Sequence, residues 1–531
     1  MLSRSFCFAL VQFITIVSLL CPNNASGAEI TMPKIFSHHM VLQREKPVPV
    51  WGWASPGEKI TVEFAGQRKE TTAGADGRWE IRLDPMLACK EGKVLIVSSG
   101  NNKSIEFNDV VVGEVWICSG QSNMAFGLRR ASEAQEDINA ADLPDMRIFQ
   151  VFNVISSSPN QDVSGRAWTV CSNQTAAGWT AVGFYFGRRL LSELDVPVGL
   201  ISAAWGGTMI EPWTPLEAFS TVPELTDYIV TFRKVVKTHR QALPDKMDTM
   251  EKWINDARKA IEKDKELPVE PVWPVYPVHN RRMPAACYNA MIYPLIPYAI
   301  RGAIWYQGET NTGNPEDIYY HKMRALIGGW RHAWAQADFP FYYVQLASFN
   351  RDYKQPTGGR KWANLRNNQL KALAITNTGM AVAIDIGEAK DIHPKNKFDV
   401  GERLARWALA RDYGKTNIVV SGPLYREMNI EGNHIRIMFD YLGGGLMVSE
   451  KIGRNPAREI KNGKLKRFAI AGADKKWVWA DAVIDGNTVV VSSPDVPKPV
   501  AVRYAYSNNP EGCNLYNRAG LPALPFRTDK W

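Results

Sequence analysis

Short, continuous apolar runs separated by amphipathic segments are the feature that most limits how this chain can fold. Amphipathic stretches with helical spacing occur among the runs, as at 184–194 and 400–413. A strand that is apolar on both faces must be covered on both faces, which is the situation of parallel strands joined by helices. The pattern therefore predicts an α/β fold, a three-layer α/β/α core with a parallel sheet at 110–417. The apolar runs are 110–117, 198–204, 303–306, 341–346 and 380–384.

Strand patterns of a different kind flank this core. Ile60, Val62 and Phe64 alternate with polar residues, which is the period of a strand with one buried face. The same alternation returns near the C-terminal end, again with glycine-containing turns between the strands. A chain of 531 residues is long enough for three folded units. We therefore predict an N-terminal β-sandwich domain at 29–109 and a C-terminal β-domain at 418–531.

Residues 225–265 interrupt the core with a helical insertion. Leu225, Ile229 and Phe232 recur at helical spacing, and Pro244 separates them from a second series of the same kind. Because proline disfavours a helix interior, the sequence predicts two helices in a hairpin. Such a hairpin either roofs the functional site or packs on the outside of the core, and helical spacing alone does not distinguish the two.

The first 28 residues have the pattern of a secretory signal peptide. Arg4 precedes an apolar run at 6–20, and small residues at 25–28 supply a cleavage site. We therefore expect the mature chain to be secreted or periplasmic. Cys21 follows the apolar run, but the bulky Leu20 before it argues against a lipoprotein anchor at that cysteine.

The remaining composition disfavours several functional classes. The formal net charge is +9, but basic residues are scattered among acidic ones, so we expect no nucleic-acid partner. No stretch after the signal is long and apolar enough for an integral membrane segment. The chain has no CxxC pair and no HExxH sequence, and we expect neither a metal nor an organic cofactor.

A candidate nucleophile follows the first core strand. The run at 110–117 leads into a turn that contains Gly120 and Ser122. A glycine turn at a strand end exposes a serine hydroxyl at the sheet edge, where backbone N–H groups can surround an oxyanion. A Gly-x-Ser sequence by itself is usually a plain turn, so the assignment depends on a matching base.

His393 is the candidate base. It follows the apolar run at 380–384 by a short loop and precedes Pro394. Because carboxyl ends of parallel strands share one edge of a sheet, this histidine is placed to face Ser122. Considered alone, it would be an ordinary loop histidine.

Two further turns follow core strands. Gln307 and Asn311 come after the run at 303–306, and Gly207 comes after the run at 198–204. An amide side chain can donate hydrogen bonds to an oxyanion, and a glycine lets a backbone N–H approach the substrate closely. Both turns are therefore candidates for an oxyanion-binding site.

In combination, these motifs resemble the sialate O-acetylesterase family, a branch of the SGNH hydrolases. The motifs are Gly120-Gln121-Ser122-Asn123-Met124, Trp205-Gly206-Gly207-Thr208, Tyr306-Gln307-Gly308-Glu309 and Asp391-Ile392-His393-Pro394-Lys395-Asn396-Lys397. The likeness extends from His39-Met40-Val41-Leu42-Gln43 to Asn509-Pro510-Glu511-Gly512, which is most of the mature chain. It implies an SGNH-hydrolase core and hydrolysis of an O-acetyl ester on a sugar or glycan, without a cofactor.

The resemblance also implies roles for the site residues. Ser122 would attack the acetyl carbonyl, and His393 would take its proton and later activate water. The N–H groups of Ser122 and Gly207, with a side-chain amide of Gln307 or Asn311, would bind the oxyanion. The implied substrate contacts are Gln121, Asn123 and Trp205.

The third member of the triad is left open by the sequence. SGNH hydrolases usually carry an aspartate three residues before the histidine, and Lys390 occupies that position here. Asp391 and Glu309 are the two carboxylates that remain as candidates, with a slight preference for Asp391. A Ser–His dyad is the third possibility.

Three hypotheses on function follow. The leading one is removal of acetyl groups from sialic acid. The second keeps the chemistry but changes the substrate to acetylated xylan or another polysaccharide. The third, from a different class, is a non-catalytic glycan-binding protein that uses some of the 18 tryptophans to stack on sugars. A binding protein, however, has no need of a serine, a histidine and oxyanion-forming turns at strand ends.

Overall fold

The computed structural model describes residues 30–100, 103–273, 280–315, 317–351, 354–359 and 361–531. The predicted signal peptide at 1–28 lies outside these ranges. Within the described ranges, no helix has both the length and the apolar character that a membrane span requires.

The core is built on a parallel sheet, as the apolar runs predicted. Its strand order is β13-β12-β11-β7-β10-β8-β9, in which β9 alone is antiparallel to its neighbour. All five predicted strands are present, and the sheet gains β8 and β9, which the apolar runs did not indicate. The bounds are β7 Ser104–Gly120, β8 Leu143–Val151, β9 Gly165–Cys171, β10 Val198–Ala204, β11 Gly302–Tyr306, β12 Phe341–Gln345 and β13 Thr378–Val382.

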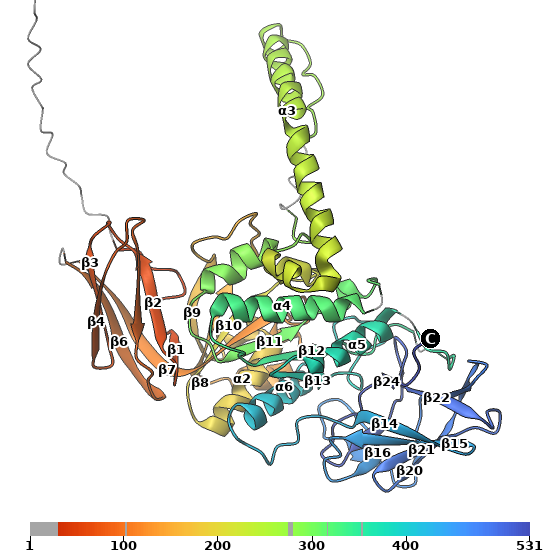
Figure 1. Ribbon diagram of the computed structural model, residues 1–531. Helices are drawn as coiled ribbons and strands as arrows, with labels where there is room; N and C mark the ends of the chain where they lie inside the picture. The colour runs from red at the N-terminus through yellow and green to blue at the C-terminus, as the bar shows by residue number, and fades with distance from the viewer. Residues whose placement is uncertain (1–29, 101–102, 274–279, 316, 352–353, 360) are drawn as a thin grey trace, which may run out of the picture.

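Helices cover both faces of this sheet (Figure 1). On one face α2 packs against α6, and both contact the sheet strands. On the other face α4 packs against α5. The predicted three-layer α/β/α arrangement is therefore confirmed. The helix bounds are α1 Ala134–Asn139, α2 Ala181–Leu194, α4 Ile318–Trp334, α5 Lys361–Lys371 and α6 Phe398–Arg411.

Strand β7 belongs to two parts of the molecule. Its first half pairs with β6 and β1 of the N-terminal β-region, and its second half pairs with β10 and β11 of the core. In that region Ile60, Val62 and Phe64 are all buried, in keeping with the period-two pattern. The other strands there are β1 Val41–Gln43, β2 Val48–Trp53, β3 Lys59–Phe64, β4 Gln67–Thr72, β5 Arg78–Leu83 and β6 Cys89–Ser99.

The chain ends in small antiparallel sheets with their own core. Ile435, Val489 and Val502 are fully buried there. The strands are β14 Leu424–Glu431, β15 His434–Asp440, β16 Leu446–Glu450, β17 Arg458–Glu459, β18 Phe468–Gly472, β19 Trp477–Trp479, β20 Asp481–Asp485, β21 Thr488–Ser492, β22 Pro499–Tyr504, β23 Leu515–Asn517 and β24 Phe526–Arg527.

The helical insertion differs from the prediction. It forms one helix, α3 (Thr226–Glu262), with Pro244 inside it, and not a hairpin of two helices. A proline removes only one hydrogen bond of the ladder, and an exposed helix can bend around its ring. Only Ile229 and Ala257 are buried in α3, and the helix projects from the body of the molecule (Figure 1). It therefore forms no roof over the core.

Candidate active site

The first three motifs lie side by side because the strands that carry them end in register. Gly120, the last residue of β7, pairs with Ala204 of β10 and with Tyr306 of β11. The turns that follow these residues therefore start at the same edge of the sheet. In open α/β sheets this carboxyl edge is where ligands bind.

Gly120 permits the sharp turn that presents Ser122. Its φ is 139°, and a Cβ at this position would lie 2.2 Å from the carbonyl oxygen of Tyr306. The N–H of Gln121 donates a hydrogen bond of 2.9 Å to the same oxygen. The turn is thus held against β11, and Ser122 is left partly exposed at the sheet edge.

The side chains of Ser122 and His393 are in contact. The distance between Ser122 Oγ and His393 Nε2 is 2.8 Å, although the residues are 271 positions apart in the sequence. The imidazole stacks near the ring of Phe126, with 6.4 Å between ring centroids, and its side chain is 29% exposed. A hydroxyl at this distance from an imidazole nitrogen is the geometry of a base-activated nucleophile.

Of the two candidate carboxylates, only Asp391 reaches the imidazole. Its Oδ1 lies 3.5 Å from His393 Nδ1 and accepts a 2.9 Å hydrogen bond from the His393 backbone N–H. Glu309 is instead buried and accepts a hydrogen bond from the amide of Asn123. Among the described residues, the Glu309 carboxylate forms no hydrogen bond or ion pair with His393.

The surroundings of His393 favour the neutral form of its imidazole. Partial burial lowers its pKa below the ordinary value of 6.5, and the positive charges of Lys397 and Arg130 add to this. Asp391 acts in the opposite direction because a nearby negative charge favours the imidazolium. A neutral imidazole with Nε2 toward Ser122 can accept the serine proton.

The backbone on both sides of His393 is held by a buried pair, which we call the Asn123–Lys397 clamp. Asn123 donates to the carbonyl oxygen of Ile392 at 3.1 Å, and Lys397 Nζ donates to that of Pro394 at 2.5 Å. Lys397 Nζ also donates to Asn123 Oδ1 at 2.6 Å. Burial lowers the pKa of Lys397 to about 7. The sequence motifs gave no role to Lys397.

The glycine loop after β10 lies against the nucleophile. A Cβ on Gly206 would be 3.3 Å from Cβ of Ser122, so the two turns are in contact. Gly207 has a φ of 74°, a conformation that glycine adopts without strain. Neither the N–H of Ser122 nor that of Gly207 has a hydrogen-bond partner among the described residues. Both donors are free to bind a developing oxyanion.

Comparison with known proteins shows the family of this chain. The model of the carbohydrate esterase family described as sialic acid-specific acetylesterase matches residues 112–253 and 279–410, just over half of the chain. The chain belongs to this family. The predicted family, the predicted fold and the predicted class of enzyme, a carbohydrate O-acetyl esterase, are confirmed. The alternative of a non-catalytic glycan-binding protein is not supported.

Full-length relatives agree with this assignment. The sialate O-acetylesterase of Rattus norvegicus is 28% identical over 95% of this chain and 95% of its own length. The human sialate O-acetylesterase is 26% identical over 97% of this chain and 96% of its own. The crystal structure of a carbohydrate acetylesterase from Xanthomonas citri is 35% identical, with a TM-score of 0.78 over 94% of this chain and all of its own.

Two expected oxyanion donors of the esterase have other partners. Gln307 is fully buried, and its amide nitrogen donates to Gln121 Oε1 and, at 2.7 Å, to Asn311 Oδ1. Asn311, 1% exposed, donates its own amide hydrogens to Glu211 at 3.0 Å. Both amides are therefore hydrogen-bonded within the protein, and their role as oxyanion donors stays a prediction. These residues form a buried polar network around the turn that follows β11.

The expected substrate contacts divide in a similar way. Gln121 and Asn123 are 3% and 1% exposed, and both side chains are hydrogen-bonded within the protein. Both side chains therefore hold the nucleophile turn and the His393 loop in place, and their contact with substrate stays a prediction. Trp205, which precedes Gly206 in the loop that contacts Ser122, is partly exposed and remains a candidate contact.

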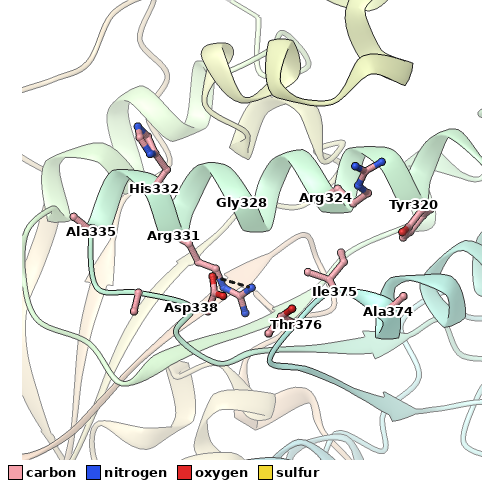
Figure 2. Close-up of a pocket in the computed structure, with 11 residues that line it drawn as sticks. Tyr320, Arg324, Gly328, Arg331, His332, Ala335, Asp338, Ala374, Ile375 and Thr376 are labelled. Carbon is pink, nitrogen blue, oxygen red and sulfur yellow. Dashed lines mark ion pairs between the residues drawn. The ribbon is translucent and has the colours of Figure 1, made fainter.

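A cavity of about 740 Å³ elsewhere in the esterase contains none of these residues (Figure 2). It lies between α4 and the loop at 374–376. Arg331 lines it, but its guanidinium already donates to the carbonyl oxygens of Phe339 and Asn377 and lies 3.8 Å from Asp338. The guanidinium of Arg331 therefore stabilises the segment after α4. The cavity itself is separate from the edge of the sheet that carries Ser122 and His393.

Proposed function

We propose that this esterase cleaves O-acetyl esters of sugars through an acetyl-enzyme on Ser122, with His393 as the proton carrier and Asp391 as its orienting carboxylate. The 2.8 Å contact between Ser122 Oγ and His393 Nε2 is the observation that carries the assignment. Because the family consists of carbohydrate esterases, we interpret this contact as that between the nucleophile and the base of ester hydrolysis.

In the first half-reaction, Ser122 Oγ forms a bond to the acetyl carbonyl carbon while its proton passes to His393 Nε2. The carbonyl oxygen becomes an oxyanion, which accepts hydrogen bonds from the N–H groups of Ser122 and Gly207. When the intermediate collapses, the bond from the carbonyl carbon to the sugar oxygen breaks. The sugar oxygen takes the proton from the imidazolium, and the acetyl group stays on Ser122.

In the second half-reaction, water replaces the sugar. His393 takes a proton from the water as it attacks the acetyl carbonyl, and the same N–H groups stabilise the second oxyanion. Collapse breaks the bond to Ser122 Oγ, which regains the proton from His393. The products are acetate and the free enzyme.

Asp391 serves this cycle in two ways. Its Oδ1 accepts the His393 backbone N–H and lies 3.5 Å from Nδ1, so it favours the tautomer that leaves Nε2 free to accept a proton. Its negative charge also stabilises the imidazolium that forms during each half-reaction. The distance to Nδ1 is long for a hydrogen bond, and such contacts commonly tighten when substrate binds.

For the substrate, we propose O-acetylated sialic acid. The family description and the names of the curated relatives support this choice. Acetylated xylan or another polysaccharide is the second candidate, because the neighbour from Xanthomonas citri is described only as a carbohydrate acetylesterase. We also propose that the enzyme is exported, on the basis of the signal pattern at 1–28.

A fluorophosphonate probe tests the nucleophile, since only an activated hydroxyl reacts with it. The expected result is labelling of Ser122 in the wild type and none in Ser122→Ala or His393→Ala, with all three proteins folded. Acetate release from O-acetylated sialic acid and from acetylated xylan then ranks the two substrates. Full esterase activity in Ser122→Ala would show that the assignment is wrong.

A further inference from the structure

An arginine lies beside the glycine loop that contacts the nucleophile. The guanidinium carbon of Arg281 is 5.7 Å from the ring centroid of Trp205. A Cβ on Gly207 would be 3.6 Å from Arg281 Nη2. Gly206 of the same loop contacts Ser122. One loop therefore contacts both the positively charged Arg281 and the residue that carries the reacting hydroxyl.

The chain brings Arg281 here by way of the long insertion. After α3, the segment at 280–286 returns to the core and is fastened at its far end. Ala285 donates its N–H to the carbonyl oxygen of Glu211 at 3.1 Å, and the Ala286 carbonyl oxygen accepts the N–H of Ser156 at 3.0 Å. The backbone is thus anchored, while the Arg281 side chain is exposed at the rim of the site.

The guanidinium of Arg281 has no acidic partner in the described ranges. Other arginines near the core are paired: Arg403 with Asp385 at 2.6 Å and Arg301 with Glu114 at 2.8 Å. Trp205 contacts the guanidinium without neutralising its charge or using its N–H donors. The N–H groups of a guanidinium lie in one plane, and two of them can donate to the two oxygens of a carboxylate.

We propose that Arg281, held by Trp205, binds the carboxylate of an acidic sugar while the O-acetyl group of that sugar reaches Ser122. This proposal rests on the proposed function and deepens it, because it selects acetylated sugars that carry a negative charge. Sialic acid and a uronate on a xylan chain offer the same chemistry. Arg281 is then a specificity residue, which sets which ester is presented to the nucleophile and not how the ester is cleaved.

The test compares matched acidic and neutral esters. One pair is O-acetylated sialic acid and its methyl ester at the carboxyl group, and the other is acetylated glucuronoxylan and its carboxyl-reduced form. Acetate release gives kcat and KM for each. The wild type is expected to prefer the acidic member of at least one pair, and Arg281→Gln to reduce that preference about tenfold, mainly through KM. The pair that responds identifies the source of the carboxylate.

Arg282→Gln is the matched control, because Arg282 is also an exposed arginine and lies one residue away. It should leave the preference unchanged, and Arg281→Lys should restore part of it. An equal loss on acidic and neutral esters in Arg281→Gln, or no loss on either, would overturn the carboxylate subsite alone. A wild type that hydrolyses 4-nitrophenyl acetate but releases acetate from no sugar would overturn the proposed substrate as well.

Discussion

Lys397 Nζ donates a hydrogen bond of 2.6 Å to the side-chain oxygen of Asn123, across 274 positions of sequence. Asn123 directly follows the nucleophile, and Lys397 is four residues beyond the base. The pair therefore connects the two loops that carry the reacting atoms. Because Lys397 is fully buried, this connection between the two loops is shielded from water.

Lys397→Met should lower kcat without unfolding the enzyme. Loss of the ammonium frees the Pro394 carbonyl and loosens the His393 loop, and a misplacement of about 1 Å can cost on the order of 100-fold in rate. Steady-state kinetics with a thermal melt check this. Lys395→Met is the control, since Lys395 is exposed two residues away and should change neither quantity. A folded Lys397→Met enzyme with wild-type kcat would contradict the role of the clamp.

The acid limb of the pH profile should lie below pH 6.5. His393 must be neutral to accept the serine proton, so kcat/KM falls as pH drops through its pKa, which burial and nearby cations lower. Arg130→Gln removes one of those cations and should move the acid limb to higher pH. Arg129→Gln, the exposed neighbour, should leave it in place. An acid limb that moves to lower pH in Arg130→Gln would show that the electrostatic account is wrong.

Asp391→Asn and Glu309→Gln should show which of the two carboxylates orients the His393 imidazole. Asp391→Asn removes the group that orients the imidazole, and losses of about 100-fold to 10,000-fold in kcat are expected for that position. Glu309 accepts a hydrogen bond from Asn123 and does not contact His393, so the kcat of Glu309→Gln should fall much less. Kinetics on both variants, with circular dichroism to verify folding, decide the question. The reverse order of effects would assign the orienting role to Glu309.

Pro244→Ala should stabilise α3 locally and leave catalysis unchanged. A proline inside a helix costs up to about 3 kcal/mol relative to alanine, and the residue is exposed on a helix that projects from the core. Hydrogen exchange of the amides around position 244 is expected to slow. Lys246→Ala, which exchanges two good helix formers, serves as the control. Unchanged exchange in Pro244→Ala would indicate that α3 is not a continuous helix at this point.

The features of this molecule that depend on local pattern could be predicted from the sequence. Apolar runs on both faces identified the parallel strands, and strand ends in such a sheet share an edge, so the strand order along the chain was enough to pair Ser122 with His393. Strands β8 and β9 were missed. Strand β9 lies at the sheet edge, and its exposed and partly buried residues lack the apolar run that a central strand shows.

The sequence did not reveal hydrogen-bond partners that are distant along the chain. Gln307 and Asn311 are chemically suited to an oxyanion, and in the structure they also donate to Gln121 and Glu211, which lie on other loops. For the same reason the contacts of Asn123 with Ile392 and Lys397 were not predicted. An amide in a catalytic motif supports a neighbouring loop as readily as it binds a ligand, and only the packed structure distinguishes the two.

Strand β7 has a consequence for how this architecture can be assembled from parts. The polypeptide that pairs with β6 continues without a break to Gly120, at the foot of the nucleophile turn. The N-terminal β-region therefore cannot be removed as an independent unit. A fusion junction placed within β7 would interrupt the strand that leads to the turn of Ser122. A gene fusion that replaces or removes the N-terminal β-region must therefore have its junction before residue 104. It must also supply a strand that pairs with the edge of β7 that would otherwise be exposed.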